Sequence, residues 1–181
     1  FIRADIPMTK REIRASVVSR LSPAKDAIVY DIGAGTGSVS VELAMHALYG
    51  TVYAVERTKE GCELIAQNAR KFGLDNIDII NASAADVIEK LPAADSVFIG
   101  GSGGELEKIM DIVLKKNPGV HIVITAVTLE TLNDSVRLME DKKVDVIDIV
   151  QIAVTQIKKR GRYHMLAANN PVFIIEGRGN R

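Results

Sequence analysis

The chain has 181 residues, of which 47% are hydrophobic and 25% are charged, and its 23 basic and 23 acidic side chains cancel. This length and composition predict a single domain over residues 1–181, with residues 1–26 as an N-terminal extension and helix. Zero net charge argues against a general binder of nucleic acids or membrane surfaces. No spanning apolar run and no signal peptide are visible, so we expect a cytoplasmic protein.

Metal-ligand patterns are missing from the sequence. The single cysteine, Cys62, excludes an internal disulfide framework and a cysteine-rich metal centre. The histidines His46, His121 and His164 are far apart and show no paired ligand spacing. We therefore predict no metal site.

The first expected helix follows a capping-box pattern, with Thr9 at the cap and Glu12 three residues later. Apolar residues recur at helical spacing from Ile13 to Leu21. A buried strand is expected over Ala27–Tyr30, and a second helix over Ser38–Ala44.

A glycine turn, Asp31–Gly37, lies between that strand and that helix. Glycines let the backbone pass close to a ligand, and a helix start offers free N–H groups and a positive dipole. A dinucleotide fingerprint would place its third glycine at Ser38, which does not fit. The glycines stand instead at Gly33, Gly35 and Gly37; the alternative is a tight turn without a ligand.

The turn resembles the E/D-x-G-x-G-x-G motif of class I S-adenosylmethionine (SAM) methyltransferases. That resemblance implies that Asp31 serves the ammonium group of SAM, directly or through water. It also implies cofactor contacts along the turn, at Gly33, Ala34, Gly35, Thr36 and Gly37.

The second expected strand, Thr51–Val55, ends at Glu56, about 20 residues beyond the glycines. An acid at this place is suited to accept hydrogen bonds from ribose hydroxyls; the alternative is a surface glutamate. After a helix at 59–72 and a strand at 77–80, the next loop matches the adenine-binding loop of these enzymes. Ser83 stands where many of them have an acid, so only the backbone around Ala84 is assigned to adenine.

A short helix at 85–91 and a strand at 96–99 lead into a second glycine cluster, Gly100–Gly104. This strand end is where methyltransferases of this class place the methyl acceptor. The N/D-P-P-Y/F motif of amine methylation is missing there. Gly101, Ser102 and Gly103 are therefore predicted to shape a pocket for a bulky or anionic acceptor; the alternative is a flexible linker.

The remaining elements are helices at 105–116 and 129–141, strands at 120–126 and 144–154, and a final strand region in two pieces, 165–168 and 171–175. A dense basic segment, Lys158–His164, precedes that region. Alternating strands and helices predict an α/β fold with a mainly parallel sheet and helices on both faces. The resemblance of the glycine turn implies that this is the seven-stranded, Rossmann-like fold of class I SAM methyltransferases.

Several stretches together resemble the precorrin carbon-15 methyltransferase (decarboxylating) family of cobalamin biosynthesis. They are Pro7–Arg14, Asp31–Gly37, Phe98–Leu106 and Asn170–Val172, and the I-G-G-S-G-G-E-L run is the most specific. The resemblance implies SAM-dependent C-methylation of a precorrin or cobalt-precorrin tetrapyrrole at carbon 15. It also implies decarboxylation of the carbon-12 acetate arm, release of S-adenosyl-L-homocysteine, and a homotetramer.

The same resemblance adds Thr9 to the expected SAM contacts. For the carboxylates of the substrate we hypothesise partners among Arg14, Arg160, Arg162 and His164, since arginine has forked donors. The alternative for the basic segment is a solvated loop.

Three other interpretations remain. A SAM-dependent RNA or protein methyltransferase would use the basic segment on a polymer, but the zero net charge and the missing amine motif weigh against it. A nicotinamide oxidoreductase would need a glycine in place of Ser38. A non-catalytic module that has kept the fold would not need the glycine turn and Glu56.

Overall fold

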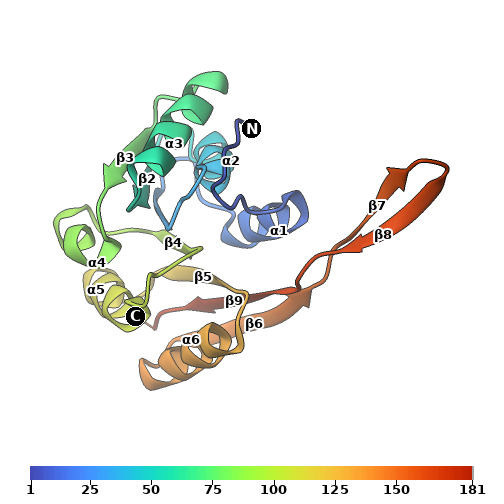
Figure 1. Cartoon of the computed structure of the whole chain (residues 1–181). Helices are drawn as coiled ribbons and strands as arrows, with labels where there is room; N and C mark the ends of the chain where they lie inside the picture. Colours follow the sequence, from blue (N-terminus) through green and yellow to red (C-terminus); the bar gives the residue numbers. More distant parts are fainter. Residues whose placement is uncertain (181) are drawn as a thin grey trace.

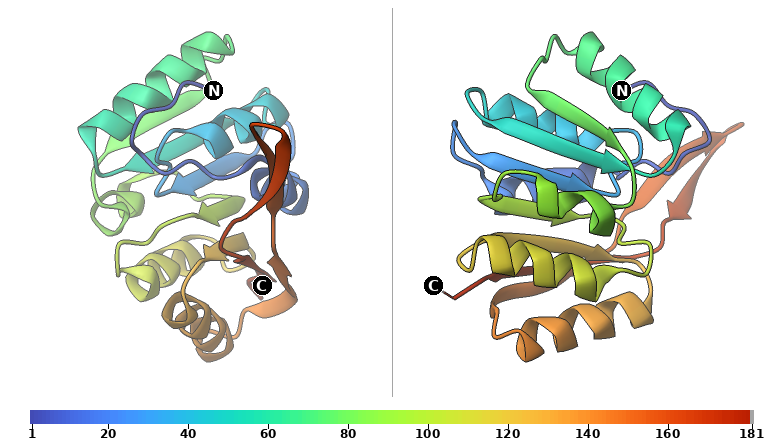
Figure 2. Two further views of the ribbon diagram at one scale, coloured as in Figure 1. Left: turned by 45° about the vertical axis from the view of Figure 1, so that its right-hand side comes forward. Right: turned by 90° about the vertical axis from the view of Figure 1, so that its left-hand side faces the viewer.

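The computed structural model of this chain describes residues 1–180 and contains a seven-stranded sheet covered by helices on both faces (Figures 1 and 2). The strand order is β3-β2-β1-β4-β5-β9-β6. Neighbours from β3 to β5 are parallel, whereas β9 runs antiparallel to both β5 and β6. The predicted fold class, a mainly parallel sheet of seven strands, is confirmed.

The strands of this sheet alternate along the chain with helices. The sheet strands are β1 (Ile28–Ile32), β2 (Thr51–Glu56), β3 (Ile77–Asn81), β4 (Ser96–Ile99), β5 (His121–Ala126), β6 (Asp145–Ile152) and β9 (Val172–Arg178). The helices are α1 (Arg11–Leu21), α2 (Ser38–His46), α3 (Lys59–Lys71), α4 (Ala84–Val87) with a 3₁₀ turn at Ile88–Lys90, α5 (Leu106–Lys116) and α6 (Leu129–Asp141). None of these helices has the length and apolar character needed to cross a bilayer.

Two hydrophobic clusters lie on the two faces of the sheet. On one face, α1 and α2 pack through residues such as Val17 and Leu43 on Val29 of β1 and Val123 of β5. On the other face, α4, α5 and α6 pack on the apolar side chains of β1, β4 and β5. Both faces are covered, so the central strands are almost wholly buried, as parallel strands usually are. The strand ends that carry the predicted site residues are thereby held rigidly at one edge of the sheet.

A β-hairpin projects from the domain beside β6 and β9 (Figure 1). Its strands are β7 (Thr155–Arg160) and β8 (Tyr163–Ala168), which pair only with each other. Two predictions were wrong here. The long strand expected at 144–154 ends at Ile152, and the segment at 165–168 belongs to the hairpin and not to the sheet. The basic segment is also not a loop, because Lys158–Arg160 are part of β7.

The N-terminal helix begins one residue later than the capping box predicts. Lys10 occupies the cap position, and no side chain caps α1. The Thr9 carbonyl instead accepts a hydrogen bond from the Arg14 guanidinium, at 2.9 Å. The predicted Thr9–Glu12 box is therefore wrong, and Thr9 remains in the extended segment that leads to the site.

Candidate active site

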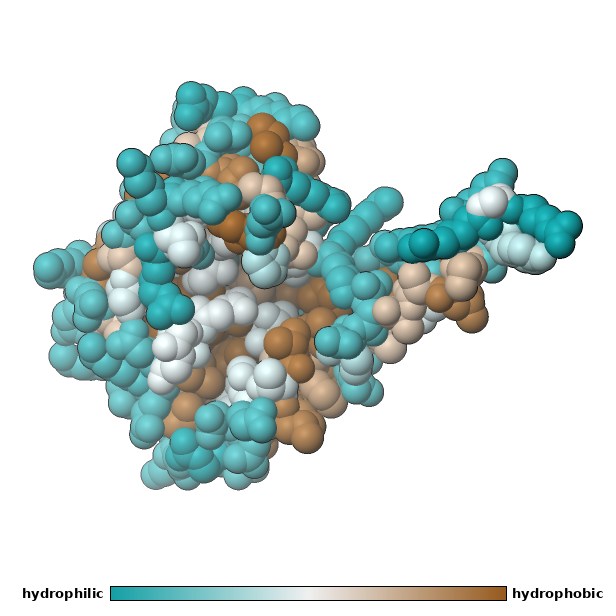
Figure 3. Space-filling view, in the orientation of Figure 1, coloured by the Kyte–Doolittle hydropathy of each residue, from teal (hydrophilic) through white to brown (hydrophobic). Residues whose placement is uncertain are grey.

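A cavity of about 730 Å³ opens at the carboxyl ends of β1, β2, β4 and β5. Figure 3 shows the hollow in the middle of the domain, with pale glycine-rich and brown apolar residues on its floor. Its volume lies within the roughly 300–1,000 Å³ of typical small-molecule sites. Ligands of open α/β sheets bind at this edge. The residues that line the cavity are Asp5–Lys10, Ile13, Ile32–Gly35, Val55–Thr58, Ala82–Ala84, Gly100–Gly103, Thr125, Val127, Asn170 and Val172.

The two glycine clusters meet at the floor of this cavity. Gly33 has a φ of +73°, and a Cβ built on it would stand 2.5 Å from the carbonyl oxygen of Gly101. The amides of Gly100 and Gly101 both donate to the carbonyl of Ile32, at 2.9 and 3.3 Å. A Cβ on Gly101, by contrast, would meet nothing within 4 Å. The backbone at Gly101 therefore presents a bare surface to the cavity.

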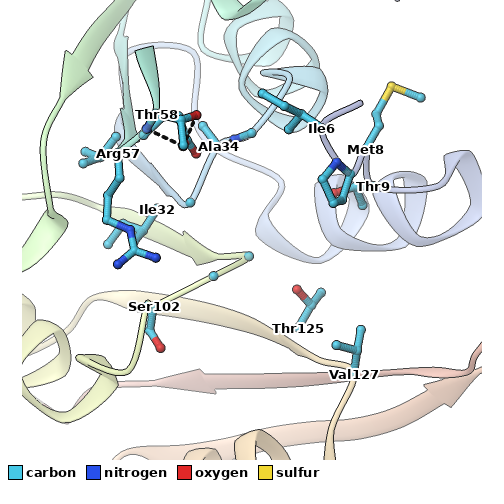
Figure 4. Close-up of a pocket in the computed structure, with 18 of the residues that line it drawn as sticks. Ile6, Met8, Thr9, Ile32, Ala34, Arg57, Thr58, Ser102, Thr125 and Val127 are labelled. Carbon is cyan, nitrogen blue, oxygen red and sulfur yellow. Dashed lines mark hydrogen bonds between the residues drawn. The ribbon is translucent and has the colours of Figure 1, made fainter. Parts of the chain in front are cut away.

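Glu56 joins the glycine turn to the start of α3. One carboxylate oxygen accepts the Gly35 N–H at 3.0 Å, and the other accepts the backbone N–H and the hydroxyl of Thr58, both at 2.8 Å. Figure 4 marks hydrogen bonds of this region as dashed lines beside Thr58 and Ala34. The carboxylate lines the cavity, and the oxygen that accepts from Gly35 has a further lone pair for a ligand hydroxyl.

Asp31 and Thr36 lie behind the floor and do not line the cavity. Asp31 is fully buried, and its Oδ2 accepts the Ser40 hydroxyl at 2.5 Å. Its Oδ1 and the Thr36 hydroxyl oxygen are buried without a hydrogen-bond partner among the described residues. Burial raises the pKa of Asp31 to about 6, against the opposing effect of the Ser40 hydrogen bond. Gly37, at φ +73°, also lies outside the cavity and packs closely on Ile65.

The extended N-terminal segment crosses the mouth of the cavity. Ile6, Met8 and Thr9 line it and are labelled in Figure 4, and a Cβ on Gly35 would stand 3.3 Å from the Pro7 carbonyl oxygen. The segment is held further back by Asn68, which is wholly buried in α3. Its amide oxygen accepts from the Ile2 N–H at 2.7 Å, and its amide nitrogen donates to the carbonyls of Ile2 and Thr36, at 3.1 and 2.9 Å.

The predicted adenine loop lies on the opposite wall. Ser83 and Ala84 line the cavity at the start of α4, and the Ser83 hydroxyl donates to the Glu105 carboxylate. Position 83 carries no acid, but Glu105, which directly follows the second glycine cluster, places a carboxylate beside it.

The structure also brings in residues that the sequence analysis missed. Arg57 and Thr58 follow Glu56 at the end of β2, Thr125 is near the end of β5, and Val127 directly follows that strand. Arg57 reaches across the cavity toward Ser102, and Thr125 and Val127 face it from the opposite side (Figure 4). These residues could have been predicted from the sequence, because the residues at the carboxyl ends of neighbouring parallel strands lie on the same side of the sheet.

The basic residues proposed for the substrate carboxylates do not line the cavity. Arg14 is buried, pairs with Glu42 at 2.5 Å and stacks on the ring of Phe1 at 4.6 Å. Its donors thus serve Glu42 of α2 and the Thr9 carbonyl of the N-terminal segment, which corrects the predicted role of Arg14 on the substrate. Arg160, Arg162 and His164 lie on the projecting hairpin, in β7, its turn and β8. Within residues 1–180, no cluster of three or more His, Cys, Asp or Glu side chains is arranged to hold a metal ion.

Comparison with known proteins decides which family has this site. The family model described as the precorrin methyltransferase domain matches residues 1–177. The chain belongs to the precorrin methyltransferase family. It is 39% identical over 178 residues to a probable cobalt-precorrin-6B C(15)-methyltransferase (decarboxylating) of Pyrobaculum calidifontis, covering 97% of this chain and 91% of that protein. It is 35% identical over 177 residues to the Salmonella typhimurium enzyme of that name, with the same coverage.

Solved structures agree with this assignment to the precorrin methyltransferase family. A precorrin-6y C5,15-methyltransferase of Geobacter metallireducens superposes with a TM-score of 0.91 at 37% identity, over 98% of this chain and 93% of that one. A tRNA methyltransferase of Aquifex aeolicus superposes with a TM-score of 0.77 over 99% of this chain and 72% of that one. At 17% identity, the latter shows the fold alone.

The residues around the cavity fit SAM, the methyl donor that this fold implies. Gly101 leaves a cradle that a Cβ would fill, and Glu56 presents to the cavity a carboxylate of the kind that accepts hydrogen bonds from hydroxyl groups. Within residues 1–180, the Oδ1 of Asp31 and the hydroxyl of Thr36 are buried beside the glycine turn without a hydrogen-bond partner, and a bound water or ligand would satisfy them.

Proposed function

We propose that this precorrin methyltransferase transfers a methyl group from SAM to carbon 15 of a cobalt-precorrin or precorrin, in cobalamin biosynthesis. The same reaction removes the carbon-12 acetate carboxylate as carbon dioxide. One observation carries the proposal: relatives of 35–39% identity over 97% of the chain are named for this reaction. The cavity at the carboxyl ends of the strands supports it, because both glycine clusters of the family resemblance form its floor.

Cofactor residues are proposed from their places around the cavity. Glu56 receives the ribose hydroxyls, the backbone at Ala84 receives adenine, and Thr9 closes the mouth. The turn from Gly33 to Gly37 holds the amino-acid end, with Asp31 and Thr36 acting from behind it through a bridging water. SAM, when bound, supplies an electrophilic methyl group and leaves as S-adenosyl-L-homocysteine.

The protein contributes position and shielding rather than a proton-transferring side chain. Gly101, Ser102 and Gly103 leave room for the acceptor carbon beside the donor, which is a proximity effect. The ring of the tetrapyrrole rests at the rim of the cavity, where the apolar Val127 lines the opening and is exposed. A dry contact there weakens the hydration of the departing carboxylate.

We also propose that the protein is a cytoplasmic homotetramer. The family resemblance is the basis, and the exposed apolar residues on the hairpin, such as Ile157 and Leu166, support association. A two-stranded hairpin is only marginally stable by itself in water, so packing against other copies would stabilise it. Both proposed reactants are charged and do not cross a bilayer unaided, which supports the location. Sedimentation of the wild type and of Leu166→Lys tests the tetramer, and equal masses for both would contradict this interface.

Arg160, Arg162 and His164 stay a prediction for the substrate carboxylates, since one chain does not bring them to the cavity.

Transfer of label tests the proposed acceptor class. The protein is incubated with methyl-labelled SAM and either cobalt-precorrin-6B or bulk RNA and protein. Label in the tetrapyrrole alone is expected. Label in RNA, with binding that weakens steeply with salt, would instead favour a polymer methyltransferase. If RNA is not labelled, nothing supports the RNA or protein methyltransferase alternative, because the zero net charge already argues against a general nucleic-acid binder.

A further inference from the structure

Arg57 is a cation of the cavity that the structure leaves without an acidic partner. It follows Glu56 at the end of β2 and lines the cavity. Ion pairs described within residues 1–180 use other arginines, namely Arg14, Arg20 and Arg137, and none of them includes Arg57. Of the charged residues around the cavity, only Lys10 is also basic.

The backbone on both sides of this side chain is fixed. Asn81, at the end of β3, donates to the carbonyls of Glu56 and Arg57, at 3.1 and 2.9 Å. The guanidinium lies against Gly103, where a Cβ would stand 2.6 Å from Nη1 and 2.7 Å from Cζ. Gly103 has a φ of +62°, a conformation that side chains rarely adopt. The second glycine cluster therefore leaves a gap through which the guanidinium reaches the acceptor side of the cavity.

We propose that Arg57 binds a carboxylate side chain of the tetrapyrrole and so orients the ring; this rests on the proposed function. A forked guanidinium suits a carboxylate. Two acids line the cavity, Asp5 and Glu56; Glu56 is engaged by Gly35 and Thr58, and neither acid is paired with Arg57 in the ion pairs described within residues 1–180. Arg57 thus takes the role that the sequence suggested for Arg14.

The carboxylate in question is one that the reaction keeps. An ion pair stabilises a carboxylate but not the neutral carbon dioxide that it becomes, so binding the departing group would raise the barrier to decarboxylation. Arg57 accordingly acts on substrate affinity and orientation, and not on the ratio of methyl transfer to carbon dioxide release.

Arg57→Gln, Arg57→Lys and the control Arg70→Gln test this assignment. Arg70 is exposed on α3, and its side chain donates to the Ala66 carbonyl at 3.3 Å. Binding of cobalt-precorrin-6B is followed by its visible absorbance, and binding of S-adenosyl-L-homocysteine by calorimetry. R57Q is expected to raise the Kd of the tetrapyrrole about tenfold or more, R57K less, and R70Q not at all. The Kd of S-adenosyl-L-homocysteine stays unchanged in all three.

Contrary outcomes separate this inference from the proposed function. A wild-type chain that binds no tetrapyrrole overturns both. A wild-type chain that binds it, with R57Q binding equally well, overturns the assignment of Arg57 alone. A raised Kd for S-adenosyl-L-homocysteine in R57Q would place the side chain on the cofactor. A changed ratio of labelled product to carbon dioxide would place it on the departing carboxylate.

Discussion

Gly33, in the turn after β1, packs directly against the backbone of Gly101, in the loop after β4, although the two residues are 68 positions apart. A Cβ on Gly33 would collide with the Gly101 backbone. The contact sets the distance between the proposed donor site and the proposed acceptor site. A change at this point therefore acts on stability and on the cofactor together.

Replacing Gly33 by alanine tests that contact, with Gly73→Ala as the control. Both glycines have a positive φ, +73° and +67°, so each alanine carries strain of about 1–2 kcal/mol. Only at Gly33 does the Cβ also collide with backbone, because nothing lies within 4 Å of a Cβ on Gly73. Denaturant unfolding should show a larger loss for G33A than for G73A, and calorimetry should show weaker SAM binding in G33A alone. Equal losses of stability in the two variants would contradict the contact.

Glu56→Gln keeps the shape of the side chain and removes its charge. The carboxylate organises Gly35 and Thr58 and is proposed to receive the ribose hydroxyls. Hydrogen bonds to charged groups contribute about 1.5–3 kcal/mol, so the Kd of SAM should rise about 10- to 150-fold. Glu63→Gln, on the exposed face of α3, is the matched control and should bind normally. Unaltered affinity in E56Q would remove Glu56 from the cofactor site.

Asn68→Ala should loosen the N-terminal segment over the cavity. The amide of Asn68 ties Ile2 to the carbonyl of Thr36, so its loss frees the segment and shifts the turn. Weaker SAM binding and faster proteolysis within residues 1–10 are expected, while the exposed neighbour variant Gln67→Ala should resemble the wild type. If N68A were cleaved and bound SAM like the wild type, the segment would not be a wall of the site.

Asp31 should make both stability and SAM binding depend on pH. Its folded pKa of about 6 lies above the ordinary value of 3.8 for an aspartate, so the folded state keeps this proton to higher pH than the unfolded state does. Its contribution to stability is therefore present below about pH 4 and is lost as pH rises to about 6, by roughly 3 kcal/mol. An Asp31→Asn variant lacks this loss, so the unfolding free energies of the two proteins should diverge between pH 4 and 7.

The ammonium of SAM favours the ionised carboxylate, so SAM affinity of the wild type should increase as pH rises through about 6. Calorimetry in buffers of different ionisation enthalpy would detect the released proton. A flat profile from pH 5 to 7.5 would separate Asp31 from the ammonium.

Much of this fold could be predicted because local patterns agreed with it. The helix at 129–141 has the predicted bounds, and those at 59–72 and 105–116 differ by one residue. The predicted cap at Thr9 is wrong, because the Arg14–Glu42 pair and the extended segment over the cavity outweigh the local preference of threonine for the cap position. The hairpin was missed because β7 and β8 lack a buried face, so no apolar alternation marked them.

For the site, the sequence indicated the strand ends but not which side chains turn inward. Gly33, Glu56, Ala84 and Gly101 line the cavity as expected, whereas Asp31 is one position too deep in β1. Arg57 escaped notice because only the gap at Gly103 brings it to the acceptor side, and such a contact between β2 and the loop after β4 has no signature in one sequence.

The most direct test of the proposed reaction is the accurate mass of its product. The protein is incubated with methyl-labelled SAM and a mixture of late precorrin intermediates, with and without cobalt. A product that gains one labelled methyl group and loses one carbon dioxide is expected, and it shows which metal state is used. Methyl gain without loss of carbon dioxide would contradict the decarboxylating reaction. If the protein binds SAM but labels no tetrapyrrole, the proposal that the methyl acceptor is a tetrapyrrole would be contradicted.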